Sequence, residues 1–416
     1  MTKIIIVMRM IFVMAIVVAA ASVATSQVSV TSYGAKCDGA TDDKTAISNA
    51  LTAAGSGILT FPINTTCLDS GTLAPTVTGV RIDLQGATLK FTGSGGGTCS
   101  RGANGLIQFT GSGQTNTILE NGYITTTSTS AGCLVNISNS SAFISRYDIH
   151  NIAFSGASGA SSTVGVYVSD VGNFYIKDNV FGPNLQQDIY APDAGSQQNS
   201  FVISGNNFRP PVTSTNYQVD IANIEGGQIN SNTFEIGPNG ILANGVVDAL
   251  QVNGNWMGDT VGTGTWINIY ATGTSQVTNN FIVGDSDSGS IGISLTGQNQ
   301  TASGNYIQSV AYGIKTGTLL GYVISGNQLQ TVATIGIQLN GGNAIAQGNL
   351  ISALGSGAIG IDSENWYQVI GPNQYYEPGS GAITLKCGSV HDTILEQAAN
   401  VSAACEDSSS IMLTPD

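Results

Sequence analysis

Two aspartates in the middle of the chain stand in short alternating segments of the same kind. Asp220 lies between Val219 and Ile221, and Asp188 comes just before Ile189. If the two segments are adjacent parallel strands, alternation turns Asp220 outward and puts Asp188 at the matching place, about 5 Å away. Two carboxylates at that distance suit a retaining glycosidase, with one as nucleophile and the other, its pKa raised by its neighbour, as acid/base. A different side-chain direction would allow an inverting mechanism, so the stereochemical outcome stays open.

Aromatic residues along the same side are predicted to bind sugar rings. A tyrosine or tryptophan ring offers a flat apolar face against which a sugar ring can pack. The predicted contacts are Tyr167, Tyr190, Tyr217, Trp266 and Tyr270. Two further acids, Glu225 and Glu235, are held in reserve as alternatives to the aspartates.

The segments that would position these residues belong to a repeat. An apolar or small residue, two mostly small polar residues and an asparagine recur at intervals of 22–27 residues. The repeated asparagines are Asn179, Asn206, Asn232, Asn255, Asn280, Asn305, Asn327 and Asn349, with a looser copy at Asn373. About half a period from each, glycine is usually followed by alternating apolar residues, as in Ile291–Leu295. A period this short, with at least two strands and no helix pattern, is typical of a β-solenoid.

Stacking explains both halves of the repeat. No coil can bury its apolar residues alone, whereas stacked coils, roughly 4.8 Å apart, bury them in one column. The asparagines would then lie above each other at one bend, where their amides can hydrogen-bond along the stack. Asparagine also tolerates the left-handed conformation that a sharp bend needs. We therefore assign the asparagines to the scaffold and predict one elongated domain of about eleven coils.

Composition narrows the choice of partner. The chain has 54 glycines in 416 residues, only 9% charged residues and a formal net charge of −14, without a basic cluster. Nucleic acid and anionic membrane surfaces are therefore excluded as expected partners. Oligomeric state is left open.

The first residues resemble a secretory signal peptide. Lys3 and Arg9 precede an apolar run, and small residues follow near Ser26. This predicts export, either to the outside of the cell or to the periplasm, without a membrane anchor after cleavage. The predicted divisions are a signal peptide over 1–26, a strand and capping helix over 27–66, coils over 67–386 and a C-terminal tail over 387–416.

Six cysteines remain in the exported chain, and an even number there suggests disulfides, with 15 possible connectivities. Sequence order favours pairing neighbours, without excluding the other connectivities. The favoured pairs are Cys37–Cys67, Cys99–Cys133 and Cys387–Cys405. The spacings do not match a zinc site, and no metal site is predicted.

The segment from Val28 to Leu51 predicts an alternating strand, a glycine turn and a short helix. Thr41 or Asp42 is the expected helix cap, and acidic residues at 42 and 43 suit the start of a helix. The apolar stripe of this helix would cover the open end of the solenoid core. Its members are Ala46, Ile47, Ala50, Leu51 and Ala54.

This segment resembles the N-terminal signature of the pectate lyase superfamily, in its rhamnogalacturonase/epimerase-like branch. The matching residues are Tyr33 to Lys36, Asp38, Gly39, Thr41, Asp42, Asp43, Ala46 and Ile47, followed by the strand over 57–62, while Cys37 replaces the usual glycine. The resemblance implies a right-handed parallel β-helix with an N-terminal capping α-helix, an all-β fold class, and a carbohydrate ligand. Because members of the superfamily differ in activity, the fold cannot choose the reaction.

The motifs of polygalacturonase-type hydrolases in this superfamily are mostly missing. Neither histidine, His150 or His391, is flanked by glycines, and Gly313-Ile-Lys315 has glycine where arginine is expected. A standard polygalacturonase is therefore not predicted. A polysaccharide hydrolase with another carboxylate site, using Asp188 and Asp220, is the first prediction, and a non-catalytic glycan-binding or surface protein is the alternative.

A calcium-assisted lyase is the third prediction. The resemblance implies an arginine or lysine base, and Arg209, on a connection expected at a cleft rim, is the first candidate before Lys177 and Lys315. Asp285 and Asp287 could bind calcium, but their turn lacks the bidentate glutamate of an EF-hand. Basic residues are sparse, so hydrolysis ranks above lyase chemistry, and no cofactor is predicted apart from calcium in a lyase.

Overall fold

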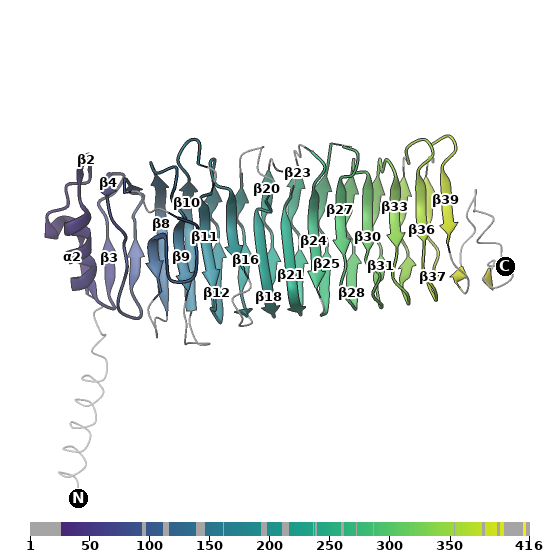
Figure 1. Ribbon diagram of the computed structural model, residues 1–416, viewed down its shortest axis with the longest axis horizontal. Coiled ribbons are helices and arrows are strands. Elements are labelled where there is room, and N and C mark those ends of the chain that lie inside the picture. Colours follow the sequence, from purple (N-terminus) through teal and green to yellow (C-terminus); the bar gives the residue numbers. More distant parts are fainter. Residues whose placement is uncertain are drawn as a thin grey trace, which may run out of the picture.

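The computed structural model describes residues 26–93, 97–110, 116–138, 146–160, 162–192, 198–209, 216–235, 237, 239–258, 262–271, 273–285, 287–352, 354–376, 379–388, 392–394 and 411–412. They form an elongated right-handed parallel β-helix with one short α-helix, α2 (Lys44–Ala54), at its N-terminal end (Figure 1). The predicted fold class is confirmed. Twelve strands follow one another along the second sheet, against the eleven coils expected from the repeat.

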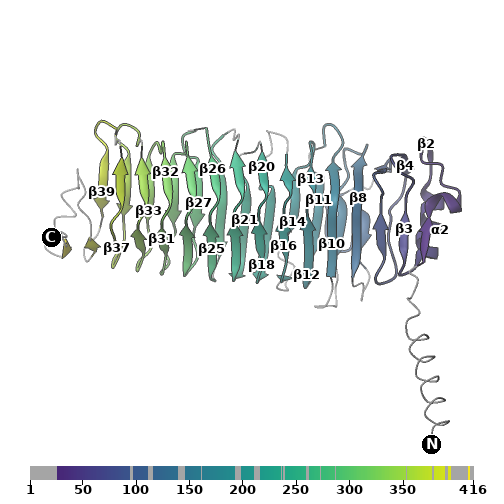
Figure 2. The same cartoon turned by 180° about the vertical axis from the view of Figure 1, so that it is seen from behind.

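The strands form two sheets, a larger sheet A, which bends at the asparagines, and a smaller sheet B. Each regular coil contributes two strands to sheet A and one strand to sheet B. Figure 2 shows the stack from behind. We call the outer surface of sheet B face B. Its strands are β7 (Gly105–Phe109), β9 (Cys133–Ser138), β11 (Val164–Ser169), β14 (Gln187–Ala191), β18 (Val219–Glu225), β21 (Ile241–Asp248), β24 (Thr265–Ala271), β27 (Ile291–Leu295), β30 (Tyr312–Thr316), β33 (Ile335–Leu339), β36 (Ile359–Ser363) and β39 (Ile383–Cys387), with the short β15 (Gln198–Asn199) beside β18.

Face A1 is the outer surface of the strands that precede the asparagines in sheet A. These are β1 (Gln27–Ser29), β3 (Ile58–Thr60), β5 (Arg81–Asp83), the first parts of β8 (Thr117–Thr126) and β10 (Arg146–Ser155), β12 (Asn173–Lys177), β16 (Val202–Ser204), β19 (Gln228–Asn230), β22 (Leu250–Asn253), β25 (Ser275–Thr278), β28 (Gln300–Ser303), β31 (Val323–Ser325), β34 (Ile345–Gln347), β37 (Val369–Ile370), β40 (Thr393–Ile394) and β41 (Ile411–Met412).

Face A2 is the outer surface of the strands that follow the bend. These are β2 (Asp38–Asp42), β4 (Thr66–Asp69), β6 (Thr88–Phe91), the second parts of β8 and β10, β13 (Val180–Phe181), β17 (Asn207–Phe208), β20 (Thr233–Glu235), β23 (Trp256–Gly258), β26 (Phe281–Val283), β29 (Tyr306–Gln308), β32 (Gln328–Gln330), β35 (Leu350–Ser352) and β38 (Gln374–Tyr376).

The asparagines form the predicted ladder between faces A1 and A2. Nδ2 of Asn179 donates to Oδ1 of Asn206 at 3.0 Å, and Nδ2 of Asn206 donates to Oδ1 of Asn232 at 3.0 Å. The pattern continues rung by rung to Asn373, and each backbone N–H also donates to the next side-chain oxygen. The asparagines do not take the left-handed conformation, however. The residue before them does, with φ of 55° at Asp178 and 66° at Gly205.

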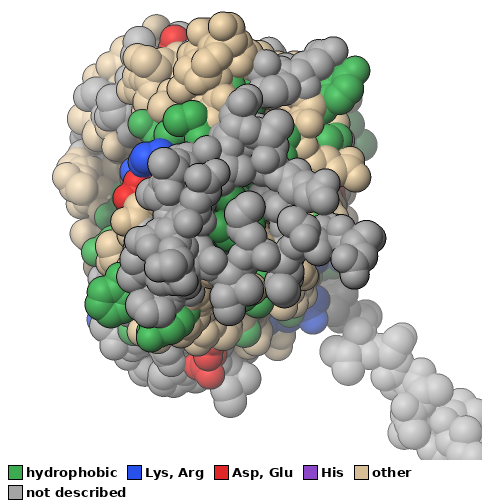
Figure 3. All heavy atoms as spheres, turned by 90° about the vertical axis from the view of Figure 1, so that its right-hand side faces the viewer, with side chains coloured by type: hydrophobic (Ala, Val, Ile, Leu, Met, Phe, Trp, Pro, Cys, Tyr) green, Lys and Arg blue, Asp and Glu red, His purple; other side chains and the backbone are tan. Residues whose placement is uncertain are grey.

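One large apolar core runs the length of the helix, and a small second cluster lies around Cys99 and Tyr167. Stacked rings mark the path of the large core: the centroids of Phe154 and Phe181, and those of Phe181 and Phe208, are 5.0 Å apart. Viewed along the long axis from the C-terminal end, charged side chains are few on the described surface, as the composition predicts (Figure 3).

Helix α2 covers the N-terminal end of the core, as predicted, and buries Ile47, Ala50, Leu51 and Ala54. Its N-cap residue is Asp43, rather than Thr41 or Asp42, and the Asp43 carboxylate does not cap the helix. It accepts hydrogen bonds from the backbone N–H groups of Lys36 at 2.7 Å and Cys37 at 2.9 Å. This acid therefore fixes the preceding turn.

Two of the predicted disulfides, Cys37–Cys67 and Cys99–Cys133, are confirmed. Cys387 is also disulfide-bonded, and Cys405 lies outside the described residues. The signal-peptide prediction concerns residues 1–26, of which 1–25 lie outside the described part of the chain. Within the described part, no helix is long and apolar enough to span a membrane.

Candidate functional site

Asp220 lies on face B, as the second residue of β18. Alternation along β18 buries Val219 and Ile221 in the core and turns Asp220 outward, as predicted. Its register partner on β14 is Tyr190, and Nε2 of Gln187, on the same strand, donates to Asp220 Oδ2 at 3.2 Å. Burial raises the pKa of Asp220, and the Gln187 hydrogen bond opposes this rise.

A hollow of about 350 Å³ opens over this carboxylate. It lies above the strands β11, β14 and β18, which are neighbours in sheet B. Its lining is mixed, with one acid, one aromatic ring, amides and a disulfide cysteine. The lining residues are Thr98, Cys99, Ser162, Val164, Gln186, Gln187, Tyr190, Asn216 and Asp220. The hollow has the apolar surface and the hydrogen-bonding groups that an uncharged polar ligand requires.

Two further tyrosines lie beside the hollow on face B without lining it. Tyr167 is buried, with 4% of its surface exposed, and Tyr217 is half-buried. The ring of Tyr167 meets that of Tyr190 edge to face, with centroids 5.9 Å apart. Beyond Asp220, the hydroxyl of Tyr217 accepts a hydrogen bond of 3.0 Å from Nδ2 of Asn268. Burial, and to a smaller extent the charge of Asp220, raises the pKa of Tyr190. Burial likewise raises the pKa of Tyr217, so both hydroxyls stay protonated at neutral pH.

The predicted placement of Asp188 beside Asp220 is wrong. Tyr190 occupies that position, and Asp188 lies fully buried in the core. The reason is an irregular strand start, where the backbone N–H groups of Asp188 and Ile189 both donate to the carbonyl of Gln218, at 3.1 and 2.9 Å. Both residues therefore point inward. Within the described residues, neither oxygen of Asp188 has a hydrogen-bond partner, and burial raises its pKa well above the usual value.

Trp266 is misplaced by the same kind of irregularity at the start of β24. Both Trp266 and Ile267 are buried, with exposed fractions of 1% and 0%. The indole packs against Gly240, where a methyl group would lie 3.1 Å from its Cε3. It therefore cannot contact a sugar. Tyr270, in contrast, is 63% exposed on face B, although it does not line the hollow.

Arg209 lies away from face B. It follows β17 at the edge of face A2, where its Nε lies 2.8 Å from Oε2 of Glu235. The predicted lyase base, Arg209, and the alternative catalytic acid, Glu235, therefore bind each other. The other reserve acid, Glu225, is exposed at the far end of β18. A lyase base at the hollow is therefore not supplied by Arg209.

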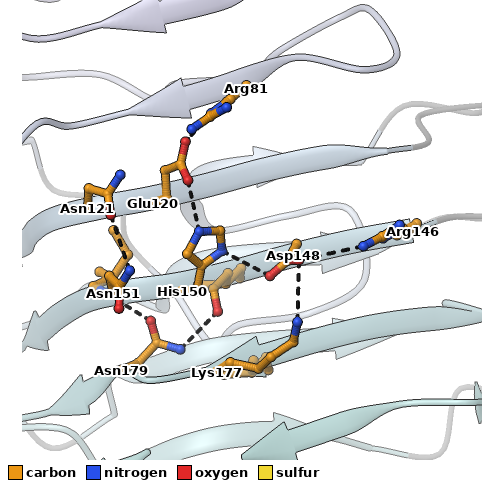
Figure 4. Close-up of polar contacts among 12 residues, drawn as sticks. Arg81, Glu120, Asn121, Arg146, Asp148, His150, Asn151, Lys177 and Asn179 are labelled. Atoms are coloured by element: carbon orange, nitrogen blue, oxygen red, sulfur yellow. Dashed lines mark hydrogen bonds and ion pairs between the residues drawn. The ribbon is translucent and has the colours of Figure 1, made fainter. Parts of the chain in front are cut away.

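A second polar cluster, on face A1, was not expected from the sequence. His150 Nε2 lies 2.8 Å from Oε2 of Glu120, and its Nδ1 lies 3.0 Å from Oδ1 of Asp148. Arg81 pairs with Glu120, and Lys177 Nζ lies 3.6 Å from Asp148 (Figure 4). The cluster crosses four neighbouring strands, β5, β8, β10 and β12. We call it the His150 network.

The predicted calcium turn is partly described. Asp285 accepts a hydrogen bond from the backbone N–H of Asp287 at 3.2 Å, an arrangement internal to the turn. Among the described residues, the one group of three ligand-type side chains is Cys37, Asp43 and Cys67, whose thiols form a disulfide. Calcium binding stays a prediction.

No protein-family model and no curated protein matches the sequence. Solved structures do match. A mutant of the DFA-IIIase of Arthrobacter chlorophenolicus A6, in complex with DFA-III, aligns with a TM-score of 0.54 at 10% identity, over 94% of this chain and 99% of that one. The same enzyme without its lid, in complex with GF2, gives 0.53 at 11% identity, over 94% and 99%. Similarity at such low identity establishes a shared β-helix fold.

The catalytic unit of the GH87 alpha-1,3-glucanase from Streptomyces thermodiastaticus strain HF3-3 aligns with a TM-score of 0.49 at 13% identity, over 94% of this chain and 71% of that one. At that score the match adds nothing to the argument from the fold.

Proposed function

We propose that the protein binds an extracellular polysaccharide on face B, with the sugar chain seated in the hollow over Asp220. The observation that carries this proposal is the set of groups around the hollow: a half-buried carboxylate next to the ring of Tyr190 and the amide of Gln187. The apolar side of a sugar ring packs on tyrosine, while its hydroxyls donate to the carboxylate and exchange hydrogen bonds with the amide.

Three further features support a polysaccharide outside the cell. The disulfides fit an oxidising compartment, in agreement with the predicted export. The solved structures that share the fold include the DFA-IIIase in complex with DFA-III and with GF2. A long, evenly stacked surface also suits an extended polymer better than a compact ligand (Figure 1).

The second candidate function is hydrolysis of the bound polysaccharide, with Asp220 as general acid. The raised pKa of Asp220 favours it, because a general acid must hold its proton near neutral pH. Glycoside hydrolysis ordinarily requires a second carboxylate as nucleophile or base. The expected partner, Asp188, points into the core, and no other acid lines the hollow within the described residues. Binding without cleavage therefore ranks first.

A polysaccharide panel separates these functions. Retention of the protein in gels that contain each polymer measures binding, while new reducing ends and the ultraviolet absorbance of unsaturated products measure hydrolysis and lyase cleavage, with and without calcium. The variants are Asp220→Asn and Tyr190→Ala. Glu225→Gln is the control, because it removes an exposed acid from the same strand.

Binding that both variants lose and the control keeps supports the proposal. Reducing ends that disappear in Asp220→Asn would establish hydrolysis instead of binding alone. Retention that neither variant weakens, or silence of the wild type on the whole panel, overturns the sugar site on face B.

A further inference from the structure

Face A2 carries aromatic side chains on three successive rungs, of which two are exposed and the third, Tyr306, is half-buried. Trp256 on β23, Phe281 on β26 and Tyr306 on β29 are register partners, so they form a column parallel to the long axis. Trp256 is 36% exposed and Phe281 is 40% exposed. The rings of Phe281 and Tyr306 stack with centroids 4.6 Å apart and planes 5° apart. We call these three residues the aromatic stripe.

A glycine allows Trp256 to lie down along its strand. Gly258 is the next outward position on β23, and a methyl group there would lie 2.6 Å from Cη2 of the indole. The six-membered ring of Trp256 therefore covers the backbone of Gly258 instead of standing away from the sheet. Contiguous apolar side chains that remain exposed on a folded surface commonly mark a contact site.

The edge of the aromatic stripe is polar, with its charges paired. Arg209 and Glu235 form an ion pair on the two rungs before Trp256. Glu235 is the register partner of Gly258, so the pair lies next to the stripe in the column of Gly258. At the other end, the hydroxyl of Tyr306 bonds to the side chains of Gln308, at 2.8 Å, and Gln330. Uncharged amides and a closed ion pair suit a neutral partner that offers hydroxyl groups.

Size decides between a polymer and a protein partner. Three rungs span only about 10 Å, whereas a stable protein interface buries about 800 Å² on each side. A narrow apolar column with hydrogen-bonding groups along it matches a sugar chain, whose rings have apolar faces and a hydroxyl rim. Since the column is parallel to the long axis, the chain would run along the solenoid.

We propose that the aromatic stripe is a second contact surface for a neutral polysaccharide, separate from the hollow on face B. The proposal rests on the proposed function for its ligand class. It deepens that function, because two contact surfaces on different faces predict tight retention on long or insoluble polymers and weaker binding of short oligosaccharides.

The test compares long polymers with short oligosaccharides of the same neutral sugar. Trp256→Ala removes the largest ring, and Gly258→Ser lifts the indole from the strand while keeping it. Trp366→Ala is the matched control, because Trp366 is 60% exposed elsewhere on the surface. Gel retention measures polymer binding, titration calorimetry measures oligosaccharide binding, and thermal unfolding confirms that each variant folds.

We expect Trp256→Ala to weaken polymer binding about tenfold and Gly258→Ser to weaken it less, with oligosaccharide binding unchanged. Equal polymer binding by Trp256→Ala and Trp366→Ala overturns the inference and leaves the function of the hollow standing. If Trp256→Ala loses polymer binding while Asp220→Asn and Tyr190→Ala keep it, the stripe is supported as a sugar-binding surface and the hollow is rejected as one. A change of molecular mass in solution in Trp256→Ala would show instead that the stripe joins copies of the chain.

Discussion

The His150 network on face A1 and the Asp220 hollow on face B both place carboxylates on the outside of a parallel sheet, yet they differ in how those carboxylates are used. In the network, both imidazole nitrogens face carboxylates, and Glu120 and Asp148 each have a second basic partner. At the hollow, Asp220 has one side-chain hydrogen bond within the described residues, from Gln187. Charges with complete sets of partners join strands, whereas an acid with few partners beside a cavity can bind a ligand.

Among the variants that test this comparison, Glu120→Gln is expected to cause the largest loss of stability. Glu120 is 3% exposed and joins Arg81 to His150, so its loss leaves Arg81 without its carboxylate and leaves His150 with Asp148 alone. We expect the free energy of unfolding in denaturant to fall by about 2–3 kcal/mol, because a hydrogen bond to a charged group contributes about that much to stability. Polysaccharide binding should not change. A loss no greater than that of exposed Glu225→Gln would mean that the network does not join the strands.

Asp188→Asn tests the acid that lies behind the hollow. Burial raises the pKa of Asp188 in the folded protein, so the stability that its neutral form provides is complete below the unfolded pKa and is lost as pH rises through the folded pKa. Asparagine never ionises. We expect similar unfolding free energies for both proteins below about pH 4, and a variant about 1–2 kcal/mol more stable at pH 7. Parallel pH profiles would contradict a buried, unpaired carboxyl.

Asp220→Asn should give the opposite pattern to Glu120→Gln. Its side chain is half-buried and has one partner, so the unfolding free energy should change by less than about 0.5 kcal/mol. Polysaccharide affinity should fall about tenfold, or about 1.4 kcal/mol, in calorimetric titrations. If stability falls and affinity stays, the two clusters have the same structural role and the comparison fails.

The smallest effect is expected from Tyr217→Phe, which shows how far the site extends along face B. The variant keeps the ring and removes the hydroxyl that accepts from Asn268. A neutral hydrogen bond contributes about 0.5–1.5 kcal/mol, and we expect a stability loss at the lower end of that range. Oligosaccharide affinity that falls more than stability would extend the sugar site to Tyr217, and unchanged affinity would end it at Asp220.

The regular parts of the molecule could be read from the sequence, and the irregular parts could not. The ladder, the capping helix and the outward direction of Asp220 all follow from periodicity. Asp188 and Trp266 each lie where two consecutive residues turn inward. At Asp188 this accompanies two backbone N–H groups that share one carbonyl in the neighbouring coil. Alternation within one strand contains no information about that neighbour.

The His150 network, by contrast, has a partial signature in the sequence. Asp148 and His150 are two residues apart on a strand and so share a face, and Glu120 is the register partner of His150 one coil earlier. The glycines that flank histidine in polygalacturonase-type motifs are absent here, whereas the acid that pairs with His150 lies one coil away. The separation from Glu120 to His150 is 30 residues, outside the 22–27-residue interval of the later coils, so the repeat alone does not reveal this pairing.

The asparagine ladder has a consequence for how the length of this protein can change. The period from Asn327 to Asn349 is 22 residues, and Leu350 is already the register partner of Gln328. A deletion of residues 328–349 would therefore join Asn327 to Leu350 and remove one whole rung, shortening the rod by about 4.8 Å. Both the hollow and the aromatic stripe lie upstream of this cut. Unequal recombination between repeats could thus adjust the reach of the molecule, coil by coil, while selection acts separately on what it binds.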